Sequence, residues 1–330
     1  IQREWTEQLK KCDEVELYII KSTVIIAGTC TGFVSNRIIR DVDFDYVIVD
    51  EAAKATFPEL AVSLNKAHKI ILVGDHQQLP PVLDTEIIRN NREKLDEESL
   101  AQGIFEKMYN MFPDDNKHRL TIQYRMHPTI GTLISHVFYN DEIQNGVEAH
   151  DRELCIEGYE DTAIEWISTS KYSSKERYEK EFDNNGKKSY QNYLERNIIE
   201  KKLLELDSKL TQKTKVAVIT GYGPQKYILQ TMVKQHSYKN LEIDVDTVDA
   251  FQGSQKDIIL YSTVRSSANK YGIGFLKSEA RINVAFSRAR CLLIIVGDMN
   301  FLDNYRIRGN KFPEIIEYIK ESEGCRIIEE

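Results

Sequence analysis

The sequence predicts an α/β protein built around parallel sheets. Short runs that are apolar on successive residues are typical of strands buried on both faces of such a sheet. Six runs of this kind occur, at residues 22–29, 46–51, 69–75, 215–222, 256–265 and 292–298. Stretches with helical spacing of apolar residues lie between them, at 57–67, 128–139, 194–210 and 224–235. This alternation of strand and helix indicates right-handed βαβ units.

The length of 330 residues predicts two domains, because one domain commonly takes roughly 100–200 residues. A short polar connection at 111–120 marks the expected boundary and gives domains of residues 1–117 and 118–330. Inside the second domain, the segment 167–190 is rich in Ser, Lys and Glu and is expected to be an exposed loop. The stretch 312–324 has the pattern of an amphipathic helix.

The composition favours a reducing, intracellular compartment, and we expect a cytoplasmic protein. The five cysteines are scattered and contain no C-x-x-C pair, which argues against a disulfide framework or a zinc site. No apolar run approaches the ~20 residues that span a bilayer, so no membrane association is expected. The net charge of −8 counts against nucleic-acid binding, because neutralising phosphates requires Lys and Arg. A local basic groove on an acidic protein is still compatible with it.

Two adjacent carboxylates, Asp50 and Glu51, follow the apolar run at 46–49. In open α/β sheets, ligands bind at the carboxyl ends of the strands. Asp50 could hold Mg²⁺ there, directly or through water, and Glu51 could act as a base toward an attacking water molecule. The alternative is an acidic pair that caps the next helix.

The next predicted strand ends in LVGDHQQLPP, residues 72–81. A glutamine at this position, Gln78, could hydrogen-bond a terminal phosphate or the attacking water. His76 has no partner His or Cys at metal-ligand spacing, so a structural role is favoured over a metal site.

The second domain opens with LTIQYRMHPTI, residues 120–130. Arg125 could reach a phosphate from there, and Tyr124 could stack on a base. The alternative for Arg125 is a surface side chain in front of a helix that begins with proline. Further on, residues 245–265 join two strands through a glycine-containing loop. Thr247 there could contact a nucleic-acid backbone, and Gly253 permits close approach to a phosphate.

Three more arginines, Arg281, Arg288 and Arg290, lie on segment 278–298, which is expected to run from helix into strand. Arg281 and Arg288 are seven residues apart, so they are predicted to share a helix face. One arginine aimed at a γ-phosphate would be an arginine finger. The alternative is a basic helix whose arginines pair with surface acids.

A nucleotide-hydrolysis site normally includes a phosphate-binding loop, G-x-x-x-x-G-K-[ST], and this chain contains none. The closest string, NNGKKS at 184–189, has Glu181 at the first glycine position and Lys188 in place of Ser or Thr. The chain also begins at Ile1 and not at Met. Together these features predict a fragment whose phosphate loop lies upstream.

The order of these motifs resembles that of superfamily 1 helicases. VDEAAKA, LVGDHQQLPPV, IQYRMHP, VDAFQGSQKD and NVAFSRAR are similar to motifs II, III, IV, V and VI. The closest branch is the up-frameshift type, with its relatives the immunoglobulin-mu-binding and senataxin helicases. The resemblance covers essentially the whole chain, and five motifs in this order are highly specific. It implies two RecA-like P-loop NTPase lobes with parallel sheets, the first incomplete, with motifs Ic to III in 1–117 and IV to VI in 118–330.

The resemblance also implies an ATP-dependent helicase or single-strand translocase that uses Mg²⁺ and hydrolyses ATP between its lobes. Asp50 would coordinate Mg²⁺, Glu51 would activate water and Gln78 would sense the γ-phosphate. Arg125 and Arg288 would contact the γ-phosphate from the second lobe. Tyr124 would lie against the adenine.

Members of this branch move 5′ to 3′ on single strands of DNA or RNA. Thr29, in a segment similar to motif Ic at 27–32, and Thr247 in motif V would grip the single strand. A monomer is expected. The sequence does not distinguish DNA from RNA, because the distinction requires a contact to the 2′-hydroxyl.

The chain departs from the family pattern in two ways. Without motifs I and Ia it is expected to bind ATP weakly and hydrolyse it poorly by itself. Gln255 stands where motif V commonly has a glutamate that contacts the ribose, although an amide can still hydrogen-bond a hydroxyl. One alternative is therefore a helicase-like scaffold that binds nucleic acid or protein without hydrolysis. Another is a helicase–nuclease fusion whose nuclease lies outside this chain.

Overall fold

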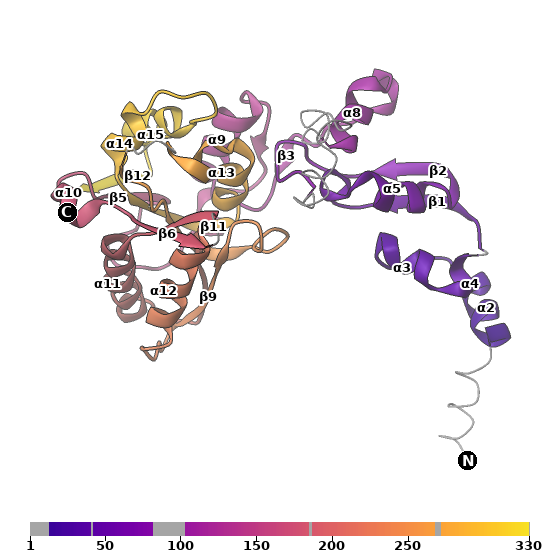
Figure 1. Cartoon of the computed structure of the whole chain (residues 1–330), viewed down its shortest axis with the longest axis horizontal. Helices are drawn as coiled ribbons and strands as arrows, with labels where there is room; N and C mark the ends of the chain where they lie inside the picture. The colour runs from indigo at the N-terminus through magenta and orange to yellow at the C-terminus, as the bar shows by residue number, and fades with distance from the viewer. Residues whose placement is uncertain (1–12, 41, 82–102, 185–186, 268–271, 330) are drawn as a thin grey trace, which may run out of the picture. The chain divides into compact units, whose positions relative to one another are not determined.

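The chain divides into two units, residues 1–118 (unit 1) and residues 119–330 (unit 2) (Figure 1). The structure is a computed structural model, and it describes residues 13–40, 42–81, 103–184, 187–267 and 272–329. Along the parts of the chain that it describes, every helix is too short or too polar to cross a membrane.

Unit 1 contains one βαβ unit. Strands β1 (Phe44–Val49) and β2 (Ala67–Leu72) pair in parallel, and helix α5 (Phe57–Leu64) connects them. Helix α5 begins with a capping box, in which the backbone N–H and the hydroxyl of Thr56 both donate to the Glu59 carboxylate at 2.8 Å. The remaining helices described in this unit are α2 (Asp13–Ser22), α3 (Cys30–Ser35), α4 (Arg37–Arg40), η1 (Ala52–Lys54), α8 (Ile104–Met111) and η2 (Asp114–Asn116).

The two faces of the β1–β2 sheet differ. One face packs into a small core that contains Val49, Leu60 and Phe105. The other face presents Ile48, which is 66% exposed, and its register partner Ile71, which is 46% exposed. Adjacent apolar side chains on an open sheet face are typical of a surface that other structure covers.

The prediction of a strand at 22–29 is wrong. Helix α2 extends to Ser22, and residues 23–29 have no regular secondary structure. Val24 is 98% exposed and Ile25 is 81% exposed. A strand requires a neighbour that pairs with its backbone groups, and none of the strands described in unit 1 pairs with this segment.

Unit 2 is organised around one sheet of six strands that pair in parallel throughout. The strand order is β12-β5-β11-β10-β8-β9. The bounds are β5 (Ile164–Ser168), β8 (Thr214–Thr220), β9 (Leu241–Thr247), β10 (Lys256–Ser262), β11 (Ala289–Gly297) and β12 (Cys325–Glu329). The strands predicted at 215–222, 256–265 and 292–298 are confirmed as β8, β10 and β11.

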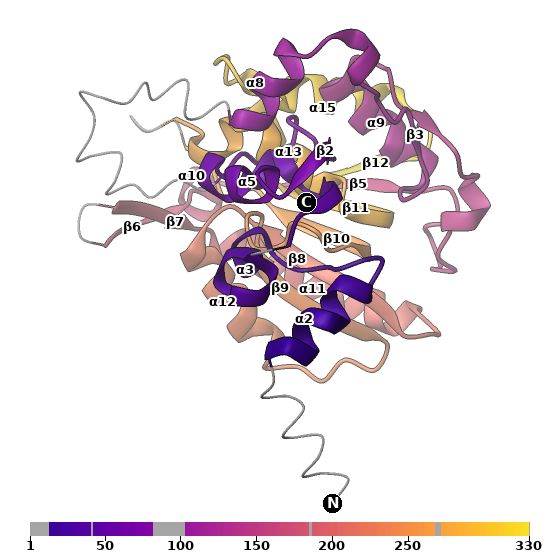
Figure 2. The same cartoon turned by 90° about the vertical axis from the view of Figure 1, so that its right-hand side faces the viewer.

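Helices cover both faces of this sheet (Figures 1 and 2). On one face lie α11 (Tyr193–Lys209) and α12 (Gly223–Val233), and on the other lie α9 (Pro128–Tyr139), α13 (Glu279–Phe286), α14 (Met299–Asn304) and α15 (Phe312–Glu321). Side chains such as Leu203 of α11 and Leu229 of α12 are fully buried against the strands. The α/β class predicted from the sequence is therefore confirmed, with three layers in unit 2.

The prediction of an exposed loop at 167–190 is also wrong. This segment contains α10 (Ser174–Arg177) and an antiparallel hairpin of β6 (Lys180–Asn184) and β7 (Lys187–Gln191). Polar side chains hold the hairpin together, since Lys188 and Tyr190 both donate to Glu181. The ring of Tyr190 packs edge-on against the buried Tyr222. Shorter elements in unit 2 are β3 (Ile122–Gln123), β4 (Gln144–Asn145), η3 (Ala149–Arg152) and η4 (Gly274–Lys277).

Candidate functional site

The carboxyl ends of β1 and β2 bring the two predicted motifs of unit 1 together. The N–H of Val73 donates to the carbonyl of Val49 at 2.9 Å, and the N–H of Ala52 donates to the carbonyl of Val73 at 2.8 Å. Asp50 and Glu51 therefore lie beside the turn that follows β2. The carboxylate pair (Asp50 and Glu51) and the turn at residues 74–78, which contains Asp75 and Gln78, therefore lie at the same edge of this small sheet.

Asp75 orients the predicted Gln78. The Asp75 carboxylate accepts from the Gln78 amide at 2.8 Å and from the backbone N–H of Gln77 at 3.0 Å. The Gln78 side chain is half-buried. The Asp75 carboxylate thereby fixes the orientation of the Gln78 amide.

Asp50 and Glu51 are both exposed. The Asp50 carboxylate accepts from the N–H of Glu51 at 3.0 Å. Glu51 has φ of 54°, in the left-handed region, which is uncommon for a residue other than glycine and tends to occur at functional sites. Among the described residues, Glu51 makes no side-chain capping bond to η1, which disfavours the capping alternative for this residue.

The arginines of motifs IV and VI meet at Ser287 in unit 2. Arg125 Nη1 donates to the Ser287 carbonyl at 3.3 Å, and Arg288 Nη2 lies 3.4 Å from the Ser287 hydroxyl. The Arg288 side chain is 2% exposed, and its Nε donates to the Val284 carbonyl at 3.2 Å. The structure therefore places the two predicted phosphate-contacting arginines next to each other, both in contact with Ser287, with Arg288 buried.

The prediction that Arg281 and Arg288 share a helix face is wrong. Helix α13 ends at Phe286, and the carbonyl of Arg288 accepts from Lys256 N–H at 3.1 Å, which draws this residue toward the sheet. Arg281 forms an ion pair with Asp249 at 3.0 Å. Arg281 therefore pairs with a surface acid, which was the alternative considered from the sequence.

The predicted residues of unit 2 occupy two opposite edges of its sheet. Arg288 and Gln255 directly precede β11 and β10 and so lie at the amino ends of these strands, whereas Thr247 ends β9 at the carboxyl edge. Strands of seven to nine residues separate the edges by roughly 20–30 Å. Arg288 lies at the opposite edge from Thr247 because the α13–β11 connection delivers this arginine before strand β11 begins.

The remaining predicted residues lie on the surface of their units. Tyr124 is 62% exposed and directly precedes Arg125. Gly253 has φ of 83° and open space where a side chain would stand, and Gln255 is exposed. Thr29 is an exposed N-cap residue of α3 whose hydroxyl accepts from Gly32 N–H at 3.1 Å.

A buried polar network at the carboxyl edge was not predicted from the sequence. Glu195 of α11 is fully buried and accepts from the Ser262 hydroxyl at 2.6 Å, the Thr263 hydroxyl at 3.1 Å and Val264 N–H at 2.9 Å. Burial raises the pKa of Glu195 to about 8. The network fixes the chain that leaves β10. Its one sequence signal is Asn192, an N-cap three residues before a glutamate.

Two further acids hold the same loop. Glu179 accepts from Ser267 N–H at 3.0 Å and forms a buried ion pair with Arg265 at 3.0 Å. Asp298, which follows β11, accepts from the Ser266 hydroxyl at 2.5 Å. These contacts join segments far apart in the sequence, and they make residues 263–267 a rigid part of the carboxyl edge.

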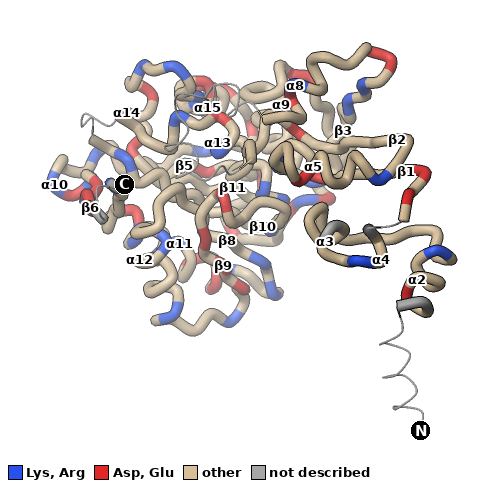
Figure 3. Tube along the Cα trace, turned by 45° about the vertical axis from the view of Figure 1, so that its right-hand side comes forward, with Lys and Arg blue, Asp and Glu red and all other residues tan. Residues whose placement is uncertain are grey.

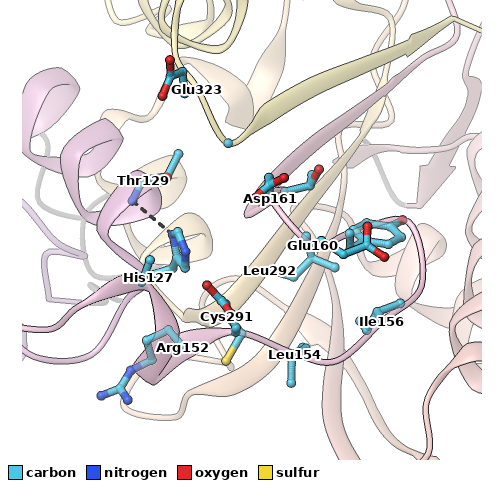
Figure 4. Close-up of a pocket in the computed structure, with 15 residues that line it drawn as sticks. His127, Thr129, Arg152, Leu154, Ile156, Glu160, Asp161, Cys291, Leu292 and Glu323 are labelled. Atoms are coloured by element: carbon cyan, nitrogen blue, oxygen red, sulfur yellow. Dashed lines mark hydrogen bonds between the residues drawn. The ribbon is translucent and has the colours of Figure 1, made fainter.

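A cavity of about 480 Å³ lies elsewhere in unit 2 (Figure 4). His127 lines it, and burial lowers the pKa of this imidazole, whose Nδ1 accepts from Thr129 N–H at 3.2 Å. Burial also raises the pKa of the Cys291 thiol to about 11, so the cavity presents a neutral thiol. The acids Glu160 and Glu323 line it as well. Such a lining disfavours a polyphosphate, and none of the residues predicted from the sequence borders this cavity.

Comparison with known proteins is consistent with this arrangement. Two family models, both described as "AAA domain", match residues 1–86 and residues 100–300. A Drosophila melanogaster protein named "Regulator of nonsense transcripts 1 homolog" is 34% identical over 301 residues, which is 89% of this chain and 24% of the relative. The Saccharomyces cerevisiae protein named "ATP-dependent helicase NAM7" is 31% identical over 324 residues, which is 97% of this chain and 31% of the relative.

Solved structures are more distant. A structure titled "The structure of PRRSV helicase" covers 76% of this chain and 34% of its own, at 18% identity and a TM-score of 0.36, which is too low to support an argument. The chain spans 24% and 31% of the two curated relatives above. The family model that matches residues 100–300 covers more than half of the chain. The chain therefore belongs to the AAA domain family, and within it the chain is a homologue of the up-frameshift type of helicase.

Proposed function

We propose that this chain is part of an ATP-dependent helicase or single-strand translocase that moves 5′ to 3′ on DNA or RNA. The observation that carries the proposal is the shared edge of β1 and β2, where Asp50 and Glu51 lie beside a turn in which Asp75 holds Gln78. Carboxylates for metal and water, next to an oriented amide, are the groups that phosphoryl transfer to water requires.

Within unit 1, Asp50 holds Mg²⁺ and Glu51 takes the proton of the attacking water. An exposed carboxylate suits Mg²⁺, which keeps several water ligands and is commonly bound by one or two carboxylates together with phosphates. When bound, Mg²⁺ neutralises charge on the β- and γ-phosphates. Gln78 hydrogen-bonds the γ-phosphate or the attacking water, in an orientation that Asp75 sets.

Within unit 2, Arg125 and Arg288 stabilise negative charge on the γ-phosphate. Their positions on either side of Ser287 support this role. Tyr124, directly before Arg125, stacks on the adenine. Gly253 allows the loop after β9 to approach a phosphate, and Gln255 hydrogen-bonds the ribose.

Single-stranded nucleic acid is the proposed partner, with Thr29 and Thr247 as backbone contacts. Lysines and arginines are interspersed with acids along the chain (Figure 3), so binding depends on local groups more than on net charge. ATP favours one arrangement of the parent protein, and hydrolysis removes that preference, which is the basis of stepwise movement. We further propose a monomeric, cytoplasmic protein.

The open face of the β1–β2 sheet supports the proposal that unit 1 is part of a larger RecA-like lobe, with residues 1–117 contributing motifs Ic to III and residues 118–330 motifs IV to VI. A two-stranded sheet by itself is only marginally stable in water. Ile48 and Ile71 form an apolar surface on which further elements of such a lobe would pack.

The test is ATP hydrolysis by the full-length protein, with and without single-stranded DNA or RNA. Glu51→Gln is expected to retain ATP binding and to lose hydrolysis by a factor of roughly 10² to 10⁴, because it removes the general base. Asp45→Asn is the matched control, since Asp45 is an exposed acid on strand β1, which ends two residues before Glu51. Its hydrolysis should equal that of the wild type.

The outcomes separate the proposal from its alternative. A motor would be established if single-stranded DNA or RNA stimulates ATP hydrolysis and if Glu51→Gln, but not Asp45→Asn, abolishes it. The nucleic acid that stimulates hydrolysis more strongly would identify the substrate. If the wild type shows no turnover with either strand, the proposal is wrong. The chain would then be a helicase-like scaffold that binds nucleic acid or protein without hydrolysis.

A further inference from the structure

The turn that carries Tyr124 and Arg125 is closed from the inside by Gln123. The Gln123 amide oxygen accepts from the N–H groups of Arg125 and Met126, both at 2.8 Å, and its amide nitrogen donates to the Met126 carbonyl at 3.0 Å. Backbone donors of the turn are thereby satisfied within the motif itself. The carbonyl groups of Tyr124 and Arg125 are left to bond with groups outside the motif.

Arg152 supplies those bonds from the end of η3, 27 residues beyond Arg125. Its Nε donates to the Arg125 carbonyl at 2.8 Å, and its Nη2 donates to the Tyr124 carbonyl at 2.6 Å. The guanidinium is a planar fork of donors, so it can bridge two successive carbonyls, and bonds from a charged donor are short and strong. In Figure 4, Arg152 lies at the edge of the cavity with its guanidinium directed away from Cys291 and Leu154.

Arg152 is itself held in place. A third donor, Nη1, bonds to the Asp151 carbonyl at 2.9 Å. Asp151 also belongs to a capping box, in which its carboxylate accepts from Glu148 N–H at 3.2 Å. The guanidinium therefore reaches the Tyr124–Arg125 backbone from a short, fixed helix.

The backbone position determines where the Arg125 guanidinium lies. Its hydrogen bond to the Ser287 carbonyl, at 3.3 Å, joins this side chain to the α13–β11 connection. Catalytic groups must be held within about 0.5 Å of their productive position, and a displacement of about 1 Å can cost 10²-fold in rate. A clamp on two consecutive carbonyls is a means of meeting that tolerance.

We propose that Arg152 is a positioning residue that holds the backbone of Tyr124 and Arg125 and so aligns both side chains on the nucleotide. The inference rests on the proposed function. Arg152 acts on hydrolysis through Arg125 and on ATP binding through Tyr124. It lies outside the motif that contains both residues.

The experiment is a double-mutant cycle in the full-length protein, read by single-turnover and steady-state ATP hydrolysis. Arg152→Ala is expected to lower the hydrolysis rate about tenfold and to raise the KM for ATP. In an Arg125→Ala background, the same substitution should leave the hydrolysis rate unchanged, because residues that act as a unit are not additive. Arg152→Lys should recover part of the rate, since an ammonium group lacks the fork that spans two carbonyls.

Arg308→Ala is the matched control, because Arg308 is an exposed arginine of unit 2. Its kinetics and melting temperature should match the wild type. If Arg152→Ala slows hydrolysis equally in both backgrounds, or not at all, the inference is wrong. Arg152→Lys decides the question should the alanine variant not fold. A wild type without ATPase activity would instead refute the proposed function, and the inference with it.

Discussion

Replacing Glu195 by glutamine should remove a pH dependence from the stability of unit 2. The carboxyl group is fully buried, and desolvation is the main cause that raises its pKa from 4.5 to about 8. The nearby Glu179 raises it further, whereas hydrogen bonds from Ser262, Val264 and Thr263 lower it. Between these two pKa values the unfolded chain has released the proton and the folded chain retains it. The contribution of Glu195 to stability is therefore fully present below about pH 4.5 and is lost as pH rises through about 8.

The magnitude follows from the linkage relation. One proton difference gives a slope of roughly 1.4 kcal/mol per pH unit. Between pH 5.5 and pH 7.5 the wild type should lose about 3 kcal/mol of unfolding free energy relative to a variant without this titration. Above pH 8 the group is ionised in both states and the difference becomes constant.

Glutamine can keep all three hydrogen-bonded contacts of the site. Ser262 and Val264 both donate to Oε2 of Glu195, and Thr263 donates to Oε1. An amide oxygen in the Oε2 position would keep the first two bonds. An amide nitrogen in the Oε1 position would donate to the Thr263 hydroxyl, which can reverse its direction.

The assay is urea denaturation of the wild type and Glu195→Gln at pH 5.5, 6.5 and 7.5, with Glu157→Gln as an exposed control. The difference between wild type and Glu195→Gln should grow with pH, while the Glu157→Gln difference should stay flat. Taking differences cancels the titration of all other groups. A constant difference across this pH range would refute the assignment of a buried, protonated Glu195.

Two other predictions concern packing and burial in unit 2. Arg326 donates to the fully buried Glu165 at 2.6 Å, and Lys202 also pairs with this carboxylate at 3.2 Å, so Arg326→Ala should destabilise the chain by about 2 kcal/mol in urea denaturation, the loss of one hydrogen bond to a charged group. Gly297→Ala would place a Cβ 2.9 Å from Cβ of the buried Thr263 and should cost about 2 kcal/mol, whereas Gly223→Ala, which meets nothing within 4 Å, should leave the melting temperature unchanged.

Sequence patterns predicted best those strands that are buried on both faces of the sheet, because all their side chains then have the same apolar environment. Strands β8, β10 and β11 are apolar on successive residues because helices cover both sheet faces. Strand β5 lacks this signal because it carries a charged residue, Glu165. Lys202 and Arg326 balance this charge, and Arg326 lies 161 residues further along the chain. Partners so distant cannot be read from a local pattern.

The two wrong predictions of secondary structure have a common physical cause. Residues 22–29 have the composition of a strand but no neighbouring strand among the described residues, and residues 180–191 have the composition of a loop but pair with each other. Pairing is a tertiary property, and strand propensity expresses mainly how well a side chain fits such a surface. Local composition therefore predicted a strand that does not form and missed a hairpin that does.

For the candidate site, the sequence pointed to candidate ligand-facing residues but not to the residues that orient them. Asp50, Glu51 and Gln78 follow strands, and the structure does bring them to one edge, although their roles stay predictions. No role was predicted for Asp75, and its hydrogen bond with Gln78 became visible only in the structure. Supports of this kind have no motif of their own, because any well-placed donor or acceptor suffices.

The two edges of the unit 2 sheet suggest why such supports are needed. Strand β10 begins with Lys256, whose N–H holds the carbonyl of Arg288, and it ends at Ser262, whose hydroxyl bonds to Glu195. One rigid strand thus connects the proposed nucleotide edge to the opposite edge, where Thr247 and the 263–267 loop lie. A motor must transmit a change at one edge to the other, and a strand can do so only if the loops at both ends are fixed to it. The buried carboxyl groups fix the loop at one end, and Arg152 holds the Tyr124–Arg125 backbone, whose arginine contacts Ser287, near the other end. We therefore regard these supports as part of the working structure and not only of its stability.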